Sequence, residues 1–265
     1  MPEGDILLRV ARRLDAAFAG RRLTRGELRW GDLGGVDLAG CLVTENATYG
    51  KHLLTRLEDG RTMHTHLRME GTWRLVRTAE LRAGRTRADR APQVRVVLAT
   101  PSWTALGRDL GMVDLVATAE EHRVIGHLGP DVLAEDLDVA DAAARILAQR
   151  DRPVAEVLLD QTVVAGLGTI YTAETLWAHR TWPWTPASAL GGLAPELVRT
   201  ARHLMLRSAR ARTPTATGDL RRTSNVHGRE HRPCPRCGTP VERGTAASGT
   251  RERQMFFCPA CQPPG

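Results

Sequence analysis

Four cysteines near the end of this 265-residue chain constrain its fold more than any other feature. They form two Cys-x-x-Cys pairs separated by twenty residues, Cys234 with Cys237 and Cys258 with Cys261. This spacing is typical of four thiolates that close tetrahedrally around one structural Zn²⁺ and leave no position for water. Disulfide bonds are the alternative, which a reducing compartment disfavours. We predict one zinc ion and a β-hairpin between the pairs, with residues 244–253 as its tip.

The basic charge of the chain is concentrated toward its C-terminal end. Residues 199–265 hold thirteen arginines and four acidic residues, whereas residues 1–198 have a net charge of −2. Guanidinium groups bind phosphate, so nucleic acid is the first partner to consider, and a solvated arginine-rich face is the alternative. Without a run of eighteen apolar residues or a leader, we expect a cytoplasmic monomer with no membrane partner.

Lysine occurs only once among the 37 basic residues, at Lys51. In a chain that otherwise uses arginine, a retained lysine indicates a need for a compact ammonium, or for an amine that can lose its proton. Chance retention of one lysine is the alternative.

The hydrophobic pattern changes along the chain from short strands to helices. Apolar spacings of three and four predict an amphipathic helix over residues 5–19. Within residues 21–117, strands are predicted over 52–57, 61–67 and 94–99, the first two around an Asp-Gly turn. Beyond residue 128, helices are predicted over 138–149, 153–162, 169–179 and 195–211. We expect an antiparallel sandwich or barrel followed by a helical part, with the boundary near residues 118–135.

The chain begins Met1-Pro2-Glu3, which places a secondary amine beside a carboxylate if the initiator methionine is removed. We expect that removal, because the second residue is small. A free α-amino group titrates near ~8, so part of it is unprotonated at neutral pH and forms a Schiff base with a carbonyl-like carbon. A terminus that merely starts a helix is the alternative.

A glycine turn, Gly166-Leu167-Gly168-Thr169, joins two of the predicted helices. Glycines let the backbone approach a ligand closely, and the amides of Gly168 and Thr169 at the start of the next helix suit a phosphate. A simple turn between helices is the alternative.

Together, these features resemble the formamidopyrimidine-DNA glycosylase/endonuclease VIII family of bifunctional base-excision enzymes, over almost the whole chain. The resemblance implies an α+β multidomain fold. An N-terminal two-layer β-sandwich with a leading helix would cover residues 1–125. A helix-two-turn-helix DNA-binding domain would cover residues 126–215, and a four-cysteine zinc-finger hairpin would cover residues 228–265.

The resemblance also implies roles for individual residues. Pro2 would be the Schiff-base nucleophile at the deoxyribose anomeric carbon, and Glu3 the acid/base that helps to open the sugar ring. Lys51 falls on the catalytic lysine that contacts phosphate. Damaged DNA is the implied partner, and the residues implied to contact it are Arg253, Gly168, Thr169 and Met69, the last of which fills the hole left by the flipped nucleotide.

Two positions depart from the family pattern. The usual second glutamate is replaced by Ile6, with only Asp5 close, and the usual asparagine of the glycine turn is Thr169. The Pro2-Glu3-Gly4-Asp5 start resembles the endonuclease VIII branch. We therefore predict a DNA glycosylase with AP-lyase activity that removes oxidised bases, with pyrimidines favoured, and cleaves the strand by β,δ-elimination. An oxidised-purine glycosylase and a non-catalytic zinc-finger DNA-binding protein are the alternatives.

Overall fold

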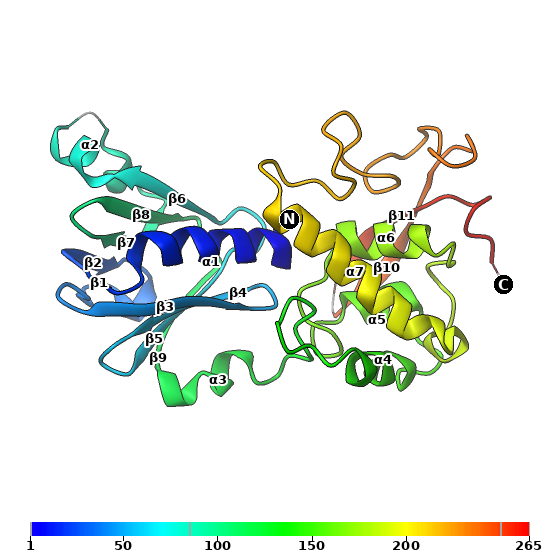
Figure 1. Cartoon of the computed structure of the whole chain (residues 1–265), viewed down its shortest axis with the longest axis horizontal. Helices are drawn as coiled ribbons and strands as arrows, with labels where there is room; N and C mark the ends of the chain where they lie inside the picture. Colours follow the sequence, from blue (N-terminus) through cyan, green and yellow to red (C-terminus); the bar gives the residue numbers. More distant parts are fainter. Residues whose placement is uncertain (1, 85, 250, 265) are drawn as a thin grey trace. The chain divides into compact units, whose positions relative to one another are not determined.

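The computed structural model describes residues 2–84, 86–249 and 251–264, so the expected removal of Met1 concerns a residue outside the described ones (Figure 1). The chain divides into two compact units. The first contains Pro2 and Ile6–His127, and the second contains Glu3–Asp5 and Leu128–Gly265. A further division of the second unit into a helical domain and a zinc finger stays a prediction.

The first unit contains two antiparallel sheets, as the predicted sandwich requires. The strand orders are β1-β3-β4-β5-β9 and β2-β7-β8-β6. The strands are β1 (Arg21–Arg22), β2 (Arg25–Leu28), β3 (Leu42–Tyr49), β4 (His52–Leu57), β5 (Arg61–His66), β6 (Thr72–Arg77), β7 (Val94–Ala99), β8 (Trp103–Arg108) and β9 (Met112–Ala117), with the short helices α2 (Thr78–Arg82) and α3 (His122–Ile125) beside them. The predicted hairpin is confirmed, because β4 and β5 pair around a turn that ends at Gly60, with φ +82°.

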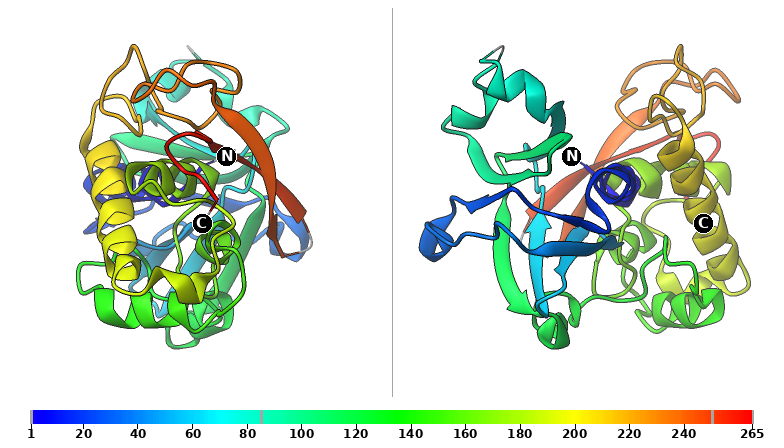
Figure 2. Two further views of the ribbon diagram at one scale, coloured as in Figure 1. Left: turned by 90° about the vertical axis from the view of Figure 1, so that its right-hand side faces the viewer. Right: turned by 60° about the vertical axis from the view of Figure 1, so that its left-hand side comes forward.

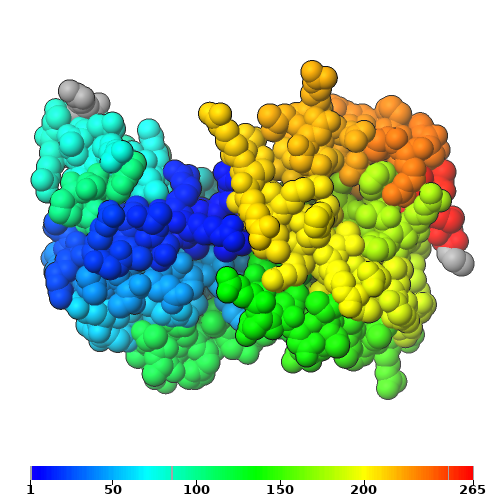
Figure 3. Space-filling model, viewed as in Figure 1, coloured from blue at the N-terminus to red at the C-terminus, as the bar shows by residue number. Residues whose placement is uncertain are grey.

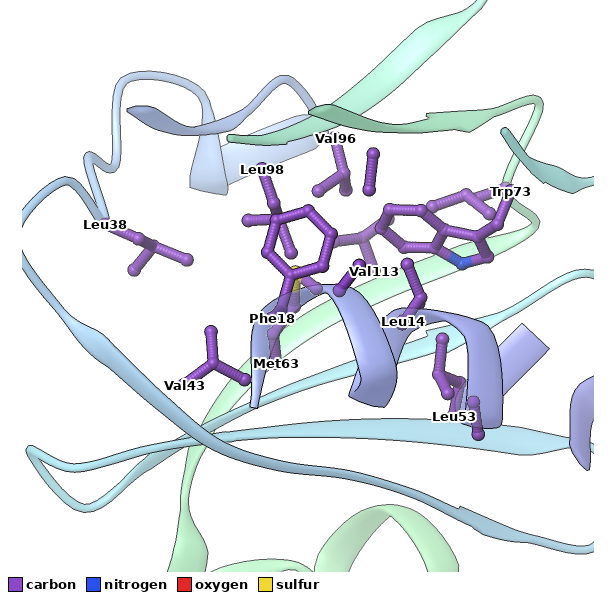
Figure 4. Close-up of a cluster of buried hydrophobic side chains, with 14 of the residues drawn as sticks. Leu14, Phe18, Leu38, Val43, Leu53, Met63, Trp73, Val96, Leu98 and Val113 are labelled. Atoms are coloured by element: carbon purple, nitrogen blue, oxygen red, sulfur yellow. The ribbon is translucent and has the colours of Figure 1, made fainter. Parts of the chain in front are cut away.

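Helix α1 (Gly4–Phe18) supplies the centre of the first unit's core. Figure 4 shows Leu14 and Phe18 of this helix surrounded by side chains from both sheets, including Met63 of β5 and Val96 of β7. Both α1 side chains are buried almost completely. Burial of such side chains is the main favourable contribution to folding, so the 3.6-residue apolar spacing explains why this segment is a helix.

The second unit consists of helices and a two-stranded ribbon, in the order that the sequence predicts (Figures 1 and 2). Asp138 caps α4, because its side chain accepts hydrogen bonds from the amides of Ala140 and Asp141. In the space-filling view, α7 and the segment that follows it form much of the visible face of this unit (Figure 3). The elements are α4 (Val139–Leu147), α5 (Val154–Leu159), α6 (Thr169–Ala178), α7 (Leu193–Arg210), β10 (Glu242–Ser248) and β11 (Arg251–Phe257).

The β10–β11 ribbon is longer than predicted. Its strands pair from Glu242 and Phe257 as far as Ser248 and Arg251, so a tip over residues 244–253 was wrong. A glycine is needed at position 244 for close packing and not for a turn, because a Cβ there would lie 2.4 Å from the Trp184 ring. The Trp184 indole also donates a 2.9 Å hydrogen bond to the Thr245 carbonyl. No helix among the described residues is long and apolar enough to cross a membrane.

We expect Phe18→Ala to lower the free energy of unfolding by about 3–5 kcal/mol, because it leaves a cavity between the two sheets. Chemical denaturation followed by tryptophan fluorescence measures this loss, with Arg12→Ala on the exposed face of the same helix as the control. Equal midpoints for the two variants would contradict the core assignment.

Candidate functional site

The carboxylate of Glu3 is bound to the start of helix α6. Its oxygens accept hydrogen bonds from the amides of Gly168 and Ile170, both at 2.8 Å, and from that of Tyr171 at 3.4 Å. The residue is 1% exposed. The first amides of a helix have no partner inside it and carry the positive end of its dipole, so they stabilise an ionised carboxylate. Glu3 is therefore fixed in place as an anion.

Gly168 is required by this close approach and not by its backbone angles. Its φ of −131° is accessible to any residue, but a Cβ there would lie 2.5 Å from the Glu3 carboxyl carbon. The sequence prediction that the Gly168 amide faces a phosphate differs from this arrangement, because the amide donates to Glu3. The reason is that a carboxylate from the start of the chain occupies the helix end that a phosphate would use.

Asp5 extends the same attachment deeper into the unit. Its Oδ2 accepts hydrogen bonds of 2.6 Å from both the Tyr171 hydroxyl and the Ser208 hydroxyl, and it is 3% exposed. Burial, together with the Asp5 charge, raises the pKa of Tyr171, so this hydroxyl remains a donor. The amide of Gly4 donates to the Gly166 carbonyl at 3.0 Å. Residues 3–5 are thus bound at three successive positions.

A second buried carboxylate, Glu174 of α6, organises the segment after α7. It accepts hydrogen bonds of 2.9–3.0 Å from the amides of Asn225, Val226 and His227. Beside it, the Thr169 hydroxyl lies 3.4 Å from His227 Nε2. Burial lowers the pKa of His227 to about 4, so its ring is neutral. Sequence reasoning missed Glu174, since nothing in the local pattern separates it from a solvated helix residue.

Lys51 and Met69 both lie in loops of the first unit. Lys51 is the second residue of the turn between β3 and β4, which Gly50 closes with φ +57°. The lysine is only 8% exposed. Met69, between β5 and β6, is 52% exposed and is one of two exposed large apolar side chains among the described residues, with Leu220.

Arg253 lies on β11 opposite Ala246, and it is half-buried between the exposed residues Glu252 and Gln254. The base of the hairpin is packed against Trp182 and Trp184, whose rings contact Phe257 at centroid distances of 4.8 and 5.2 Å. These contacts hold the β10–β11 ribbon, and with it Arg253, in a defined orientation within the second unit. Arg253 is thus placed on a supported strand and not on a free tip.

The four cysteines meet at one point, as their spacing predicts. Their sulfur atoms lie within 4.8 Å of one another. Three sulfur pairs are separated by 3.5, 3.5 and 4.0 Å. Zn–S bonds of about 2.3 Å in a tetrahedron put the sulfurs about 3.8 Å apart, so the cluster has the dimensions of a zinc site. The Thr239 hydrogen bonds lower the pKa of Cys237 to about 6, whereas burial raises the pKa of Cys258 to about 12. A bound Zn²⁺ would hold both sulfurs as thiolates.

The cysteine cluster is also tied to the far end of α6. The Trp177 indole donates to Cys234 Sγ at 3.4 Å. The Arg236 guanidinium lies over the Trp177 ring at 4.1 Å and donates to the Trp177 carbonyl at 3.0 Å. A cation at the C-terminal end of a helix interacts favourably with the helix dipole. Helix α6 therefore carries Glu3 at its start and the cysteine cluster at its end.

Gly168→Ala should displace the Glu3 carboxylate, because the added methyl group occupies its position. We expect the amides of Ile170 and Tyr171 to exchange with deuterium more than about tenfold faster, since hydrogen bonds to a charged group are worth about 1.5–3 kcal/mol each. Gly192→Ala is the matched control, because a Cβ there meets nothing within 4 Å. Unchanged exchange in Gly168→Ala would contradict this close approach.

Comparison with known families covers most of the chain. Residues 1–115 match the formamidopyrimidine-DNA glycosylase N-terminal domain, and residues 128–217 match the formamidopyrimidine-DNA glycosylase H2TH domain. Among solved structures, a Lactococcus lactis formamidopyrimidine-DNA glycosylase bound to DNA that contains an AP site is similar in fold. Its TM-score is 0.81 at 22% identity, over 99% of this chain and 100% of that one.

Two curated relatives are similar over nearly their whole length. A probable endonuclease 8 2 of Streptomyces coelicolor is 41% identical, over 99% of this chain and 94% of the relative. A DNA-(apurinic or apyrimidinic site) lyase Nei2 of Mycolicibacterium smegmatis is 37% identical, over 99% of each chain. The sandwich, the helical unit, the cysteine cluster and these matches agree, and the chain belongs to the formamidopyrimidine-DNA glycosylase/endonuclease VIII family, in its endonuclease VIII-like branch.

Proposed function

We propose that this protein is a DNA glycosylase and AP lyase of base excision repair, with Pro2 as its nucleophile. The observation that carries the proposal is the buried attachment of Glu3, Gly4 and Asp5, which holds the preceding residue in one position. A frayed terminus would need no such attachment. A reactive amine does need it, because a nucleophile held in the attacking geometry avoids much of the entropic cost of the reaction.

In this mechanism the Pro2 nitrogen attacks C1′ of the damaged nucleotide and gives its proton to Glu3, while the bond from C1′ to the base breaks and the base takes a proton from solvent. The C1′–O4′ bond then breaks, and Glu3 returns its proton to O4′ as the ring opens. The product is an iminium ion, which acidifies the neighbouring sugar protons. Loss of the C2′ proton then expels the 3′ phosphate, and a second elimination expels the 5′ phosphate. Glu3 starts as an ionised carboxylate held by three amides, so its first task is to accept a proton.

The proposed DNA contacts are of three kinds, namely cations for phosphates, an apolar side chain and a hydroxyl. Lys51 supplies a compact ammonium to a phosphate near the sugar, and Arg253 supplies a guanidinium from the ribbon. Met69 is the apolar side chain that enters the space vacated by the flipped nucleotide. Thr169 contributes a hydroxyl next to His227, in place of the amide side chain usual in this family. Gly168 acts through Glu3, by making room for it.

Zinc is the proposed metal, one ion per chain, held by Cys234, Cys237, Cys258 and Cys261. Four sulfur ligands leave no open position, so the ion supplies structural cross-linking of the hairpin base and no catalysis. The proposal includes an intracellular location, where DNA is found and thiols stay reduced.

Oxidised pyrimidines are the proposed substrates. The resemblance of the Pro2-Glu3-Gly4-Asp5 start to the endonuclease VIII branch supports this preference, and duplexes with thymine glycol or 8-oxoguanine test it. Faster release of 8-oxoguanine would assign the protein to the oxidised-purine alternative. Binding of both duplexes without any release would assign it to the non-catalytic alternative.

Borohydride reduction on an abasic-site duplex should trap a covalent adduct, and peptide mapping should place that adduct on Pro2. Lys51→Arg removes the single lysine, so trapping by this variant locates the adduct on the α-amine. An N-terminal extension should abolish trapping without abolishing DNA binding. If the extended protein is trapped as well as the parent, Pro2 is not the nucleophile.

Cys258→Ser should lose the metal and weaken DNA binding, because the hairpin base is no longer cross-linked. Atomic emission should find one zinc per chain in the parent and less than about half of that in the variant. Cys41→Ser is the matched control, since this cysteine lies in the first unit, outside the cluster. A parent that binds DNA fully with no metal present would refute the zinc assignment.

A further inference from the structure

A cluster of histidines on the larger sheet has no role in the proposed reaction. His64 lies opposite Asp114 in the β5–β9 pairing, and His52 lies opposite His66 in the β4–β5 pairing. Side chains two residues apart on a strand share one face, so His64 and His66 project from the same face as His52. His52 directly follows Lys51 in the sequence. Three strands therefore bring titratable groups together beside the single lysine.

Three of these groups form a hydrogen-bonded chain. Asp114 Oδ2 lies 2.8 Å from His64 Nδ1, and His64 Nε2 lies 2.7 Å from His52 Nδ1. The His52 and His64 rings are nearly parallel, with an angle of 17° between them and centroids 4.9 Å apart, as an edge-to-edge hydrogen bond between their nitrogens requires. His64 is 0% exposed and His52 is buried as well. Both distances are those of good hydrogen bonds, so each proton has a defined place.

The tautomers follow from the carboxylate. An ionised carboxylate only accepts hydrogen bonds, so His64 Nδ1 carries the proton that faces Asp114. A neutral His64 then has a lone pair on Nε2, which accepts the Nδ1 proton of His52. His52 is left with a lone pair on its own Nε2. The chain thus runs from a carboxylate through two neutral imidazoles to one basic nitrogen.

The neighbouring groups that act most strongly on His52 oppose its protonation, whereas Asp114, at the far end of the chain, acts on His64. Burial, followed by the nearby His66, His64, His127 and Lys51, lowers the pKa of His52 to about 3. Burial lowers the pKa of His64 in spite of Asp114. Burial, with His64, Lys51 and Arg68, lowers the pKa of His66 to about 4.

We propose that the chain from Asp114 through His64 to His52 takes up a proton when DNA phosphates bind beside Lys51, and so adds a further positive charge there. The inference rests on the proposed DNA-binding function. A phosphate offsets the repulsion between Lys51 and His52, so protonation becomes more favourable. The acid form of the buffer, or hydronium, gives up the proton and keeps the electron pair of its broken bond, and an N–H bond forms at His52 Nε2. No bond within the protein breaks, because the Nδ1 proton already donates toward His64 and, through it, toward Asp114.

Calorimetry measures this proton directly. A duplex with a tetrahydrofuran abasic analogue, which cannot be cleaved, is titrated into the protein at pH 6.5 in buffers of different ionisation enthalpy. The slope of the observed enthalpy against buffer ionisation enthalpy gives the protons taken up, and we expect a positive slope that corresponds to a fraction of a proton per complex, because burial still opposes the charge on His52. Because the complex holds more protons than its free components, its affinity should rise as the pH falls from 7.5 to 6.

Three variants locate the proton. His52→Gln and His64→Gln should lower the uptake to less than about half of the parent value, since each interrupts the chain. Asp114→Asn keeps the shape and the acceptor oxygen of the side chain while removing its charge, so it tests the chain if a histidine variant fails to fold. It should also lower the uptake. His122→Gln, on the exposed surface of α3, is the matched control and should leave the uptake unchanged.

Several results would overturn the proposal. Binding of the duplex by the parent with no proton uptake would do so, as would undiminished uptake in folded His52→Gln or Asp114→Asn. Uptake that is lost only in His66→Gln would assign the proton to His66 and reject the chain. A protein that takes up the proton but gives no borohydride adduct would leave the chain intact and reject the proposed catalytic function alone.

Discussion

The bond between the Glu3 carboxylate and the start of helix α6 is the interaction on which the rest of the site depends. It satisfies helix amides that have no partner within the helix, and it places a buried negative charge at the positive end of the helix dipole. The same contact fixes the backbone next to Pro2. One interaction therefore contributes to the stability of the second unit and to the order of the chain terminus. A substitution at Glu3 affects both properties, so losses of activity there need a stability measurement beside them.

Helix α6 connects two sites that the sequence separates widely. Its start binds Glu3 and its end contacts Cys234 through Trp177, while Arg236 donates to its last carbonyls. From its middle, Glu174 holds the amides of residues 225–227. A short helix with such contacts at both ends and along its side has few ways to move independently. One helix thereby connects the cysteine cluster to the amides that hold Glu3.

Features that depend on neighbouring residues could be predicted from the sequence. The apolar spacing placed the first helix at residues 5–19, against Gly4–Phe18 in the structure, and the strand over 94–99 coincides with β7. The cysteine cluster followed from its spacing. These patterns are local, because the repeat of apolar side chains that marks a helix or a strand can be recognised within a few residues.

Features that depend on distant partners could not be predicted in this way. Glu3 meets residues more than 160 positions away, and no local signal indicates which helix its carboxylate binds. From the sequence, Gly168 was interpreted as a phosphate contact. In the structure a glycine is needed there because the Glu3 carboxylate lies against it, and the sequence of the turn itself does not indicate this contact. The histidine chain joins three strands, and its chemistry arises from their register. Its partners become visible only once the sheet is assembled.

Because the chain has a single lysine, the folded protein offers very few lysine amines to chemical reagents. Lys51 is the only ε-amine in the chain, and the β3–β4 turn keeps it nearly closed to solvent. Acetylating enzymes, amine cross-linkers and lysine-directed dyes therefore find almost no lysine target on the folded surface, whose basic side chains are arginines. Apart from the α-amine at the start of the chain, such reagents will report on the opening of one turn. Labelling of Lys51 is thus a measure of local unfolding at the site where this chain retains a lysine.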